Sequence, residues 1–169
     1  MDRTLILLRH AKAQEGGARD HDRELTARGQ RDARAAGAWL HQQSYGIDEV
    51  LCSTAERARQ TAQGVWDGGC AEADVRYENR IYEAQPEALL QVLREADEDA
   101  QVVMLVGHSP GIPTLASLLA DGEGKRGAHE ALAQGYPTAG IAVLSFQGHW
   151  ADLAFGAAAL ERFKVARDA

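Results

Sequence analysis

Three short apolar runs in the sequence each end at side chains that can do chemistry. They are residues 5–8, followed by Arg9 and His10; residues 50–52, followed by Ser53 and then Arg57; and residues 102–106, followed by Gly107 and His108. Short apolar runs bounded by polar residues are typical of strands buried within a sheet. We therefore expect histidines and arginines to gather at one sheet edge, where open α/β sheets bind their ligands.

Helical patterns lie between these strands. Thr26 fits the N-cap of a helix, and the apolar face of that helix carries Ala33, Ala36, Trp39 and Leu40. Further helices are expected over residues 55–66, 86–96 and 110–119, and a short strand over residues 73–77. This alternation predicts a mostly parallel sheet with helices on both faces. The predicted fold class is α/β, a three-layer αβα arrangement in one compact domain over residues 1–169, without large lid insertions.

The last third of the chain is expected to be less regular. Residues 121–137 are the richest in glycine and are interpreted as one long irregular segment. Residues 141–146 and 150–155 are predicted to form a hairpin around the turn at Gln147 and Gly148. The chain from Glu161 onward is interpreted as a polar tail.

Composition excludes several classes of function. A net charge of −7 argues against general nucleic-acid binding, and no apolar run is long enough to cross a membrane. Two cysteines give no disulfide framework, which favours a cytoplasmic location. Basic residues nevertheless crowd the first thirty positions, which indicates a small site for an anion. They are Arg3, Arg9, Lys12, Arg19, Arg23 and Arg28.

The strand-end residues suit attack on a phosphate group. An imidazole with a pKa of about 6.5 is mostly neutral, hence nucleophilic, at pH 7, and Arg9 and Arg57 would lower the pKa of His10 further. Guanidinium groups also match phosphate oxygens geometrically. His108 precedes a helix whose N-terminus attracts anions, although it could simply cap that helix, and Arg57 could simply lie on a helix surface.

Five motifs in fixed order resemble those of the histidine phosphatase superfamily, the branch with the phosphoglycerate mutases. Within that branch the chain is similar to the short SixA-like phosphohistidine phosphatases. The motifs are residues 8–10, residues 22–26 with Gly29, residues 53–61, residues 106–108 and residues 138–140. The block at 53–61 is the most specific of them.

The resemblance implies that His10 is transiently phosphorylated while Arg9, Arg57 and His108 hold the phosphoryl group. It also points to Glu83 as the proton donor for the leaving group, although Glu83 could equally favour a helix start. Other residues expected at the substrate are Lys12, Arg23 and Ser53, of which Arg23 could instead form a salt bridge at the helix entry. No metal and no other cofactor is expected.

The expected substrate is a phosphohistidine displayed on a protein such as a histidine phosphotransfer domain. Only residues 12–24 and 121–137 are long enough to cover a site, and an open pocket suits a phosphate on a protein surface. A small phosphorylated molecule remains the alternative. We expect a monomer or a weak dimer that binds neither nucleic acid nor membrane.

Three rival interpretations stay open. Ser109 lies in a Gly-x-Ser-x-Gly pattern that is typical of serine hydrolases. Its triad would need Asp121 or Asp152 together with His129 or His149. Cys52 precedes Arg57 by four intervening residues, whereas cysteine phosphatases resemble Cys-x5-Arg. The third possibility is a module that binds phosphate without turning it over.

Overall fold

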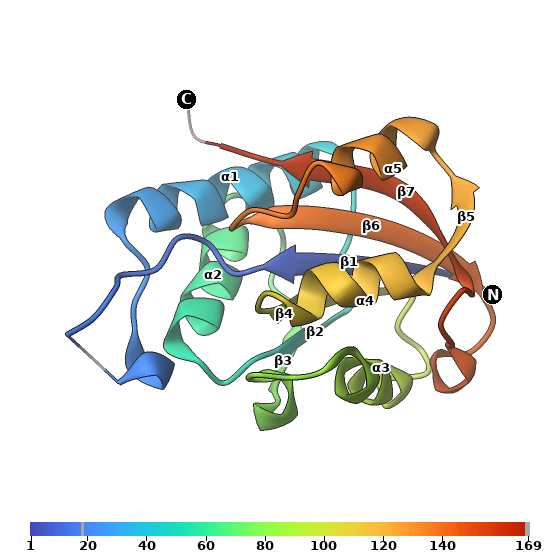
Figure 1. The fold of residues 1–169 in the computed structure, drawn as a ribbon, viewed down its shortest axis with the longest axis horizontal. Helices are drawn as coiled ribbons and strands as arrows, with labels where there is room; N and C mark the ends of the chain where they lie inside the picture. The colour runs from blue at the N-terminus through green and yellow to red at the C-terminus, as the bar shows by residue number, and fades with distance from the viewer. Residues whose placement is uncertain (18, 168–169) are drawn as a thin grey trace.

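The computed structural model of the chain describes residues 1–17 and 19–167. Within these residues one sheet contains β1 (Asp2–Arg9), β2 (Glu49–Cys52), β3 (Asp74–Tyr77), β4 (Val102–Gly107), β5 (Ala120–Gly124), β6 (Gly140–Gln147) and β7 (Ala158–Val165). The strands lie in the order β3-β2-β4-β1-β6-β7-β5 (Figure 1). Neighbours from β3 to β1 run parallel, and β6 is antiparallel to both β1 and β7. The predicted, mostly parallel sheet is confirmed.

Helices cover both faces of this sheet (Figure 1). They are α1 (Ala27–Gln42), α2 (Glu56–Asp67), α3 (Pro86–Arg94), α4 (Gly111–Leu119) and α5 (Arg126–Ala133), with short 3-10 turns η1 (Asp20–Asp22), η2 (Asn79–Ile81) and η3 (Trp150–Asp152). Alternate side chains of β1 point to opposite faces. Leu5 and Leu7 therefore pack with α3 and α4, whereas Ile6 and Leu8 pack with α1 and α2. The three-layer α/β fold is confirmed.

Among the described residues, no helix has both the length and the apolar character needed to cross a bilayer. Thr26 caps α1 as predicted, because its side chain accepts a hydrogen bond from the backbone N–H of Gly29.

The last third of the chain corrects three expectations. Residues 121–137 are not one irregular segment, since they contain most of β5 and the whole of α5. The partner of β6 is not residues 150–155 but β7, and the supposed polar tail from Glu161 is the second half of β7. Trp150 is fully buried and its indole N–H donates to the carbonyl of Ala100, which holds residues 150–152 in η3 instead of a strand. The second half of β7 alternates half-buried and exposed side chains. It therefore has no continuous apolar run, and its polar residues favour a tail when only the sequence is considered.

The contact between α1 and α2 depends on a glycine, and Gly37→Ala is expected to destabilise the fold by about 1–3 kcal/mol. A Cβ at Gly37 would lie 2.3 Å from the carbonyl oxygen of Val65, so the two helices would have to move apart. The matched control is Gly127→Ala in α5, where nothing lies within 4 Å of the added atom; there alanine should stabilise by up to about 1 kcal/mol. Urea unfolding measures both changes, and equal effects of the two variants would contradict the prediction.

Candidate active site

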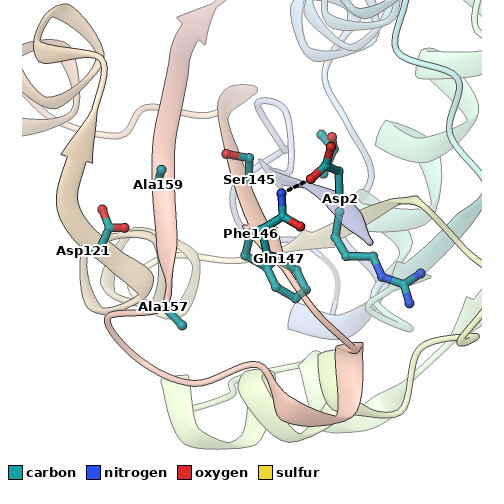
Figure 2. A pocket seen from close by; sticks show the side chains of 9 residues that line it. Asp2, Asp121, Ser145, Phe146, Gln147, Ala157 and Ala159 are labelled. Carbon is teal, nitrogen blue, oxygen red and sulfur yellow. Dashed lines mark hydrogen bonds between the residues drawn. The ribbon is translucent and has the colours of Figure 1, made fainter.

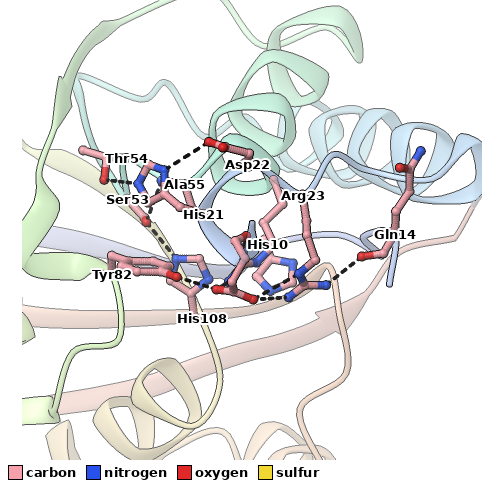
Figure 3. Close-up of polar contacts among 12 residues, drawn as sticks. His10, Gln14, His21, Asp22, Arg23, Ser53, Thr54, Ala55, Tyr82 and His108 are labelled. Carbon is pink, nitrogen blue, oxygen red and sulfur yellow. Dashed lines mark hydrogen bonds and ion pairs between the residues drawn. The ribbon is translucent and has the colours of Figure 1, made fainter. Parts of the chain in front are cut away.

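The carboxyl ends of β1, β4 and β2 bring the predicted strand-end residues together. Arg9 pairs in register with Gly107, and the backbone N–H of His10 donates to the carbonyl of Gly107 at 2.9 Å. The rings of His10 and His108 therefore lie side by side, with centroids 5.2 Å apart (Figure 3). Parallel strands in adjacent positions thus deliver both histidines to one edge of the sheet.

His10 is held in the form that can act as a nucleophile. Its Nδ1 lies 2.7 Å from the carbonyl oxygen of Ala11. A carbonyl only accepts, so Nδ1 carries the proton and Nε2 keeps its lone pair. Burial, followed by the charges of Arg57 and Arg9, lowers the pKa of His10 to about 4. The imidazole is therefore neutral at pH 7.

The backbone around His10 is fixed by two motifs from distant parts of the chain. The N–H of Ala11 donates to the hydroxyl of Thr61, the last residue of the 53–61 block. The N–H of Ala139 donates to the carbonyls of both Arg9 and His10, at 3.0 and 3.1 Å. Ala139 is fully buried and has a φ of 60°, a left-handed conformation that is uncommon for alanine. These contacts explain the presence of the two motifs, which position the nucleophile without touching its ring.

His108 presents an N–H hydrogen-bond donor, its Nδ1, at the site. Its Nε2 lies 2.7 Å from the hydroxyl of Ser53, which also accepts from the N–H of Ala55. The hydroxyl of Ser53 is therefore assigned as the hydrogen-bond donor to Nε2 of His108, so Nδ1 carries the ring proton. Burial lowers the pKa of His108 to about 3, followed by the positive charge that His10 carries once it is protonated in acid. Ser53 is fully buried behind His108, so it orients that ring.

Three buried nitrogens at the site have no hydrogen-bond partner. Four such side-chain atoms exist among the described residues, and three of them are Nε of Arg9, Nε of Arg57 and Nδ1 of His108. Buried donors are nearly always paired in folded proteins. Three unpaired donors on residues around a neutral histidine therefore predict a cradle for an anion.

The rest of the Arg57 guanidinium is bound to Asp20 in the segment that crosses the site. We call this segment, residues 12–17 and 19–24, the strap. Nη1 of Arg57 donates to the carbonyl of Asp20 at 2.7 Å, and Nη2 lies 3.2 Å from its carboxylate. The same carboxylate binds Arg23 and accepts a hydrogen bond from the hydroxyl of Tyr82. The Tyr82 hydrogen bond and the charge of Arg57 lower the pKa of Asp20 to about 2. Arg23 thus forms the salt bridge that the sequence offered as one alternative, and a contact of Arg23 with substrate stays a prediction.

Asp20 and Tyr82 were not singled out by the sequence. Asp20 is one of several acidic residues in a polar stretch, and Tyr82 follows a short turn in another loop. No signal in the sequence distinguishes Asp20 from Glu15, Asp22 and Glu24 in the same segment.

Two expected residues have exposed side chains. The side chain of Lys12 is exposed, and its backbone carbonyl accepts from the N–H of Thr26. Glu83 is exposed as well and has a φ of 56°. It lines a cavity of about 200 Å³ together with His108 and Ser109. This position leaves a role in proton transfer as a prediction.

Arg3 does not belong to the site. It is buried at the opposite end of β1, where its guanidinium binds Glu98 and the carbonyl of Ala100. A cavity of about 570 Å³ opens beside it, lined by residues that include Asp2, Asp121 and Gln147 (Figure 2). Neither His10 nor His108 is among the residues that line this cavity.

The structure does not support the serine-hydrolase and cysteine-phosphatase interpretations. His129 binds the carbonyl of Glu123 and His149 binds Glu98, so neither is joined to Ser109 within the described residues. The thiol of Cys52 is buried, and burial raises its pKa to about 12. A protonated thiol cannot serve as the nucleophile at neutral pH.

Comparisons with known proteins agree with this geometry. The family model of the histidine phosphatase superfamily (branch 1) matches residues 5–89. An uncharacterized protein of Mycobacterium tuberculosis (strain ATCC 25618 / H37Rv) is 42% identical over 162 residues, which cover 95% of this chain and 100% of the relative.

Two solved structures are also similar. The putative phosphohistidine phosphatase SixA from Nakamurella multipartitia has a TM-score of 0.87 and 37% identity, covering 98% of this chain and 97% of that one. The putative phosphohistidine phosphatase SixA from Agrobacterium tumefaciens has a TM-score of 0.77 and 33% identity, covering 96% and 97%.

The neutral state of His10 makes stability depend on pH. Its pKa is about 4 in the folded protein and about 6.5 in an unfolded chain. Between these values the unfolded chain binds more protons, so stability falls as the pH falls, by up to about 3 kcal/mol from this residue. Urea unfolding at pH 7 and at about pH 4.5 should show a smaller loss for His10→Asn than for the unmodified protein. The control His129→Asn, at a half-buried histidine in α5, should behave like the unmodified protein, and an equal loss in all three would contradict the prediction.

Proposed function

Because the chain belongs to the histidine phosphatase superfamily (branch 1) and is a phosphatase with a histidine nucleophile, we propose that it hydrolyses phosphohistidine on a protein. In this proposal the phosphoryl group is carried on Nε2 of His10. The observation that supports it most is the set of three buried, unpaired nitrogens beside that ring, from Arg9, Arg57 and His108.

The first step transfers the phosphoryl group to the enzyme. The lone pair on Nε2 of His10 attacks phosphorus in line, and the bond between phosphorus and the leaving nitrogen breaks. The leaving imidazole takes the bonding pair, and its nitrogen acquires a proton from solvent water. Arg9, Arg57 and His108 hold the phosphoryl oxygens. Because these donors are already fixed, little reorganisation is needed as charge develops, and phosphoryl transfer depends mainly on positioning and charge stabilisation.

The second step regenerates the enzyme. A water molecule attacks the phosphorus of phosphorylated His10, the bond from phosphorus to Nε2 breaks, and Nε2 recovers its lone pair. The protons of the water pass to solvent and to the released phosphate. His10 returns to the neutral state favoured by burial and by the two arginines.

The site is open enough for a phosphate displayed on a protein. Glu83, which lines a cavity with His108, is exposed, and half of the Asp20 side chain on the strap reaches solvent. The two similar SixA structures are described as putative phosphohistidine phosphatases. A histidine phosphotransfer domain is the partner that fits this chemistry, and a small phosphomonoester is the alternative.

A panel of substrates tests the proposal. The panel contains a phosphohistidine protein, a phosphoserine peptide and small sugar phosphates, each followed by release of inorganic phosphate. We expect the highest kcat/KM for the phosphohistidine protein. Comparable or better turnover of a sugar phosphate would refute the proposed substrate, and retention of labelled phosphoprotein without release would favour a binding module.

Glu83→Gln is expected to separate the two kinds of leaving group. General acid catalysis typically contributes about 10²–10⁴-fold, and an alkoxide needs that proton more than an imidazole does. Hydrolysis of a phosphomonoester should therefore fall by about 10²-fold, and that of phosphohistidine by less than about tenfold. The exposed control is Glu87→Gln, in the first turn of α3, which should change neither rate. Equal losses on both substrates would contradict the prediction.

A further inference from the structure

The carboxylate of Asp20 lies on the same cation that would hold a phosphoryl group. Oδ2 is 3.2 Å from Nη2 of Arg57, and the backbone carbonyl of Asp20 accepts from Nη1 at 2.7 Å. Oδ1 lies 3.0 Å from Nη2 of Arg23. Two of the cations that face the pocket are thus already bound to an anion that belongs to the chain.

Tyr82 holds this carboxylate close to the histidines. Its hydroxyl donates to Oδ2 of Asp20, and its ring packs edge-on against His108 with centroids 5.6 Å apart. The guanidinium carbon of Arg57 lies 5.9 Å from the centre of the same ring. Asp20 is therefore held on Arg57 and close to His108, two of the three residues that carry an unpaired buried nitrogen.

An incoming phosphoryl group and this carboxylate carry charges of the same sign. Like charges that share a site repel each other, so one of them is bound less well while the other is present. Half of the Asp20 side chain is exposed, at 51%, and solvent can receive it when it leaves Arg57.

We propose that Asp20 is a resident carboxylate that competes with oxyanions for Arg57 and Arg23 and thereby keeps the affinity of the pocket for inorganic phosphate low. This inference rests on the proposed function, since it needs the pocket to bind phosphoryl groups. It gives the enzyme a means of releasing product: when phosphate leaves, the carboxylate takes its place on the two arginines. A substrate on a protein compensates through its additional contacts, whereas free phosphate has none.

The test is the affinity of Asp20→Asn for two oxyanions, orthophosphate and tungstate. Both are measured as competitive inhibitors of hydrolysis and by calorimetric titration at constant pH and salt. Removal of one negative charge next to the bound anion should lower both Ki values by roughly tenfold. The matched control is Asp22→Asn, which removes the same charge from η1 at a carboxylate 3.8 Å from His21. This control should change Ki by less than about twofold.

Tyr82→Phe provides a second variant that keeps the charge of Asp20. It removes only the hydroxyl that donates to the carboxylate, so the carboxylate is held less firmly and Ki should fall by about two- to fivefold. Thermal unfolding confirms that each variant is folded.

Unchanged or higher Ki values in both folded variants would overturn the inference. They would instead assign Asp20 to orienting Arg57 or to donating a proton, and the latter role would appear as a loss of kcat. Failure of the unmodified protein to bind either oxyanion would overturn the proposed function as well. If the unmodified protein binds them and the variants bind no tighter, only the inference about Asp20 fails.

Discussion

His10→Ala is expected to abolish both phosphate release and the acid-labile phosphoenzyme. The variant lacks the one ring nitrogen that the site holds unprotonated for attack, while the cradle formed by Arg9, Arg57 and His108 remains. Loss of the nucleophile in an enzyme with covalent catalysis costs on the order of 10⁴-fold or more in kcat. Binding of an oxyanion should survive, because the ring donates no hydrogen bond to it.

Labelled substrate makes this prediction quantitative. The reaction is quenched within one turnover, and the label that remains on the protein is measured after treatment with acid and after treatment with alkali. A phosphohistidine loses the label in acid and keeps it in alkali. The matched control is His129→Ala, a half-buried histidine in α5 whose ring contacts the carbonyl of Glu123, away from the strand-end site. This control should keep full turnover. Labelled enzyme in His10→Ala, or a turnover within tenfold of the unmodified protein, would exclude His10 as the nucleophile.

The sequence was sufficient to predict the half of the site that is carried by strands. A buried strand is recognised from its apolar run, and the residues directly after its carboxyl end must lie at the edge of the sheet. His10, Ser53 and His108 could therefore be placed at one edge before any coordinates. The strand register then brings them close together, because Arg9 pairs with Gly107 and Cys52 with Val106.

The half of the site that is carried by loops could not be predicted in this way. Asp20 and Tyr82 are 62 positions apart, and neither the strap nor the loop after η2 has a periodic pattern. Their contact depends on how two irregular segments fold over a finished sheet. The prediction of a polar tail from Glu161 is wrong for a different reason. The polar residues there alternate with half-buried ones along β7, a pattern that fits an edge of the sheet as well as an exposed tail.

Arg57→Lys is expected to lower kcat/KM by about 10²–10³-fold, the usual loss when one fixed donor to a developing charge is removed. Nε of Arg57 is unpaired, and Nη1 and Nη2, which bind Asp20 in the resting site, become available to a phosphoryl group when that carboxylate leaves. A lysine keeps the positive charge but carries a single terminal nitrogen, so it cannot offer phosphoryl oxygens the planar set of N–H donors that a guanidinium provides. The loss of kcat/KM would therefore report the contribution of the guanidinium geometry, because the positive charge is unchanged.

Arg59→Lys is the matched control, because it makes the same exchange on the same helix but outside the cradle. Its guanidinium lies 4.1 Å from the centre of the Tyr77 ring, and its Nε donates to the carbonyl of Thr54. We expect its kcat/KM to stay within about threefold of the unmodified protein, since contacts of this kind contribute little near the surface. Arg57→Lys should still accumulate the phosphoenzyme slowly, which distinguishes it from His10→Ala. Equal activity of the two lysine variants would show that the phosphoryl group binds elsewhere, because a guanidinium that holds it through Nε cannot be exchanged without loss.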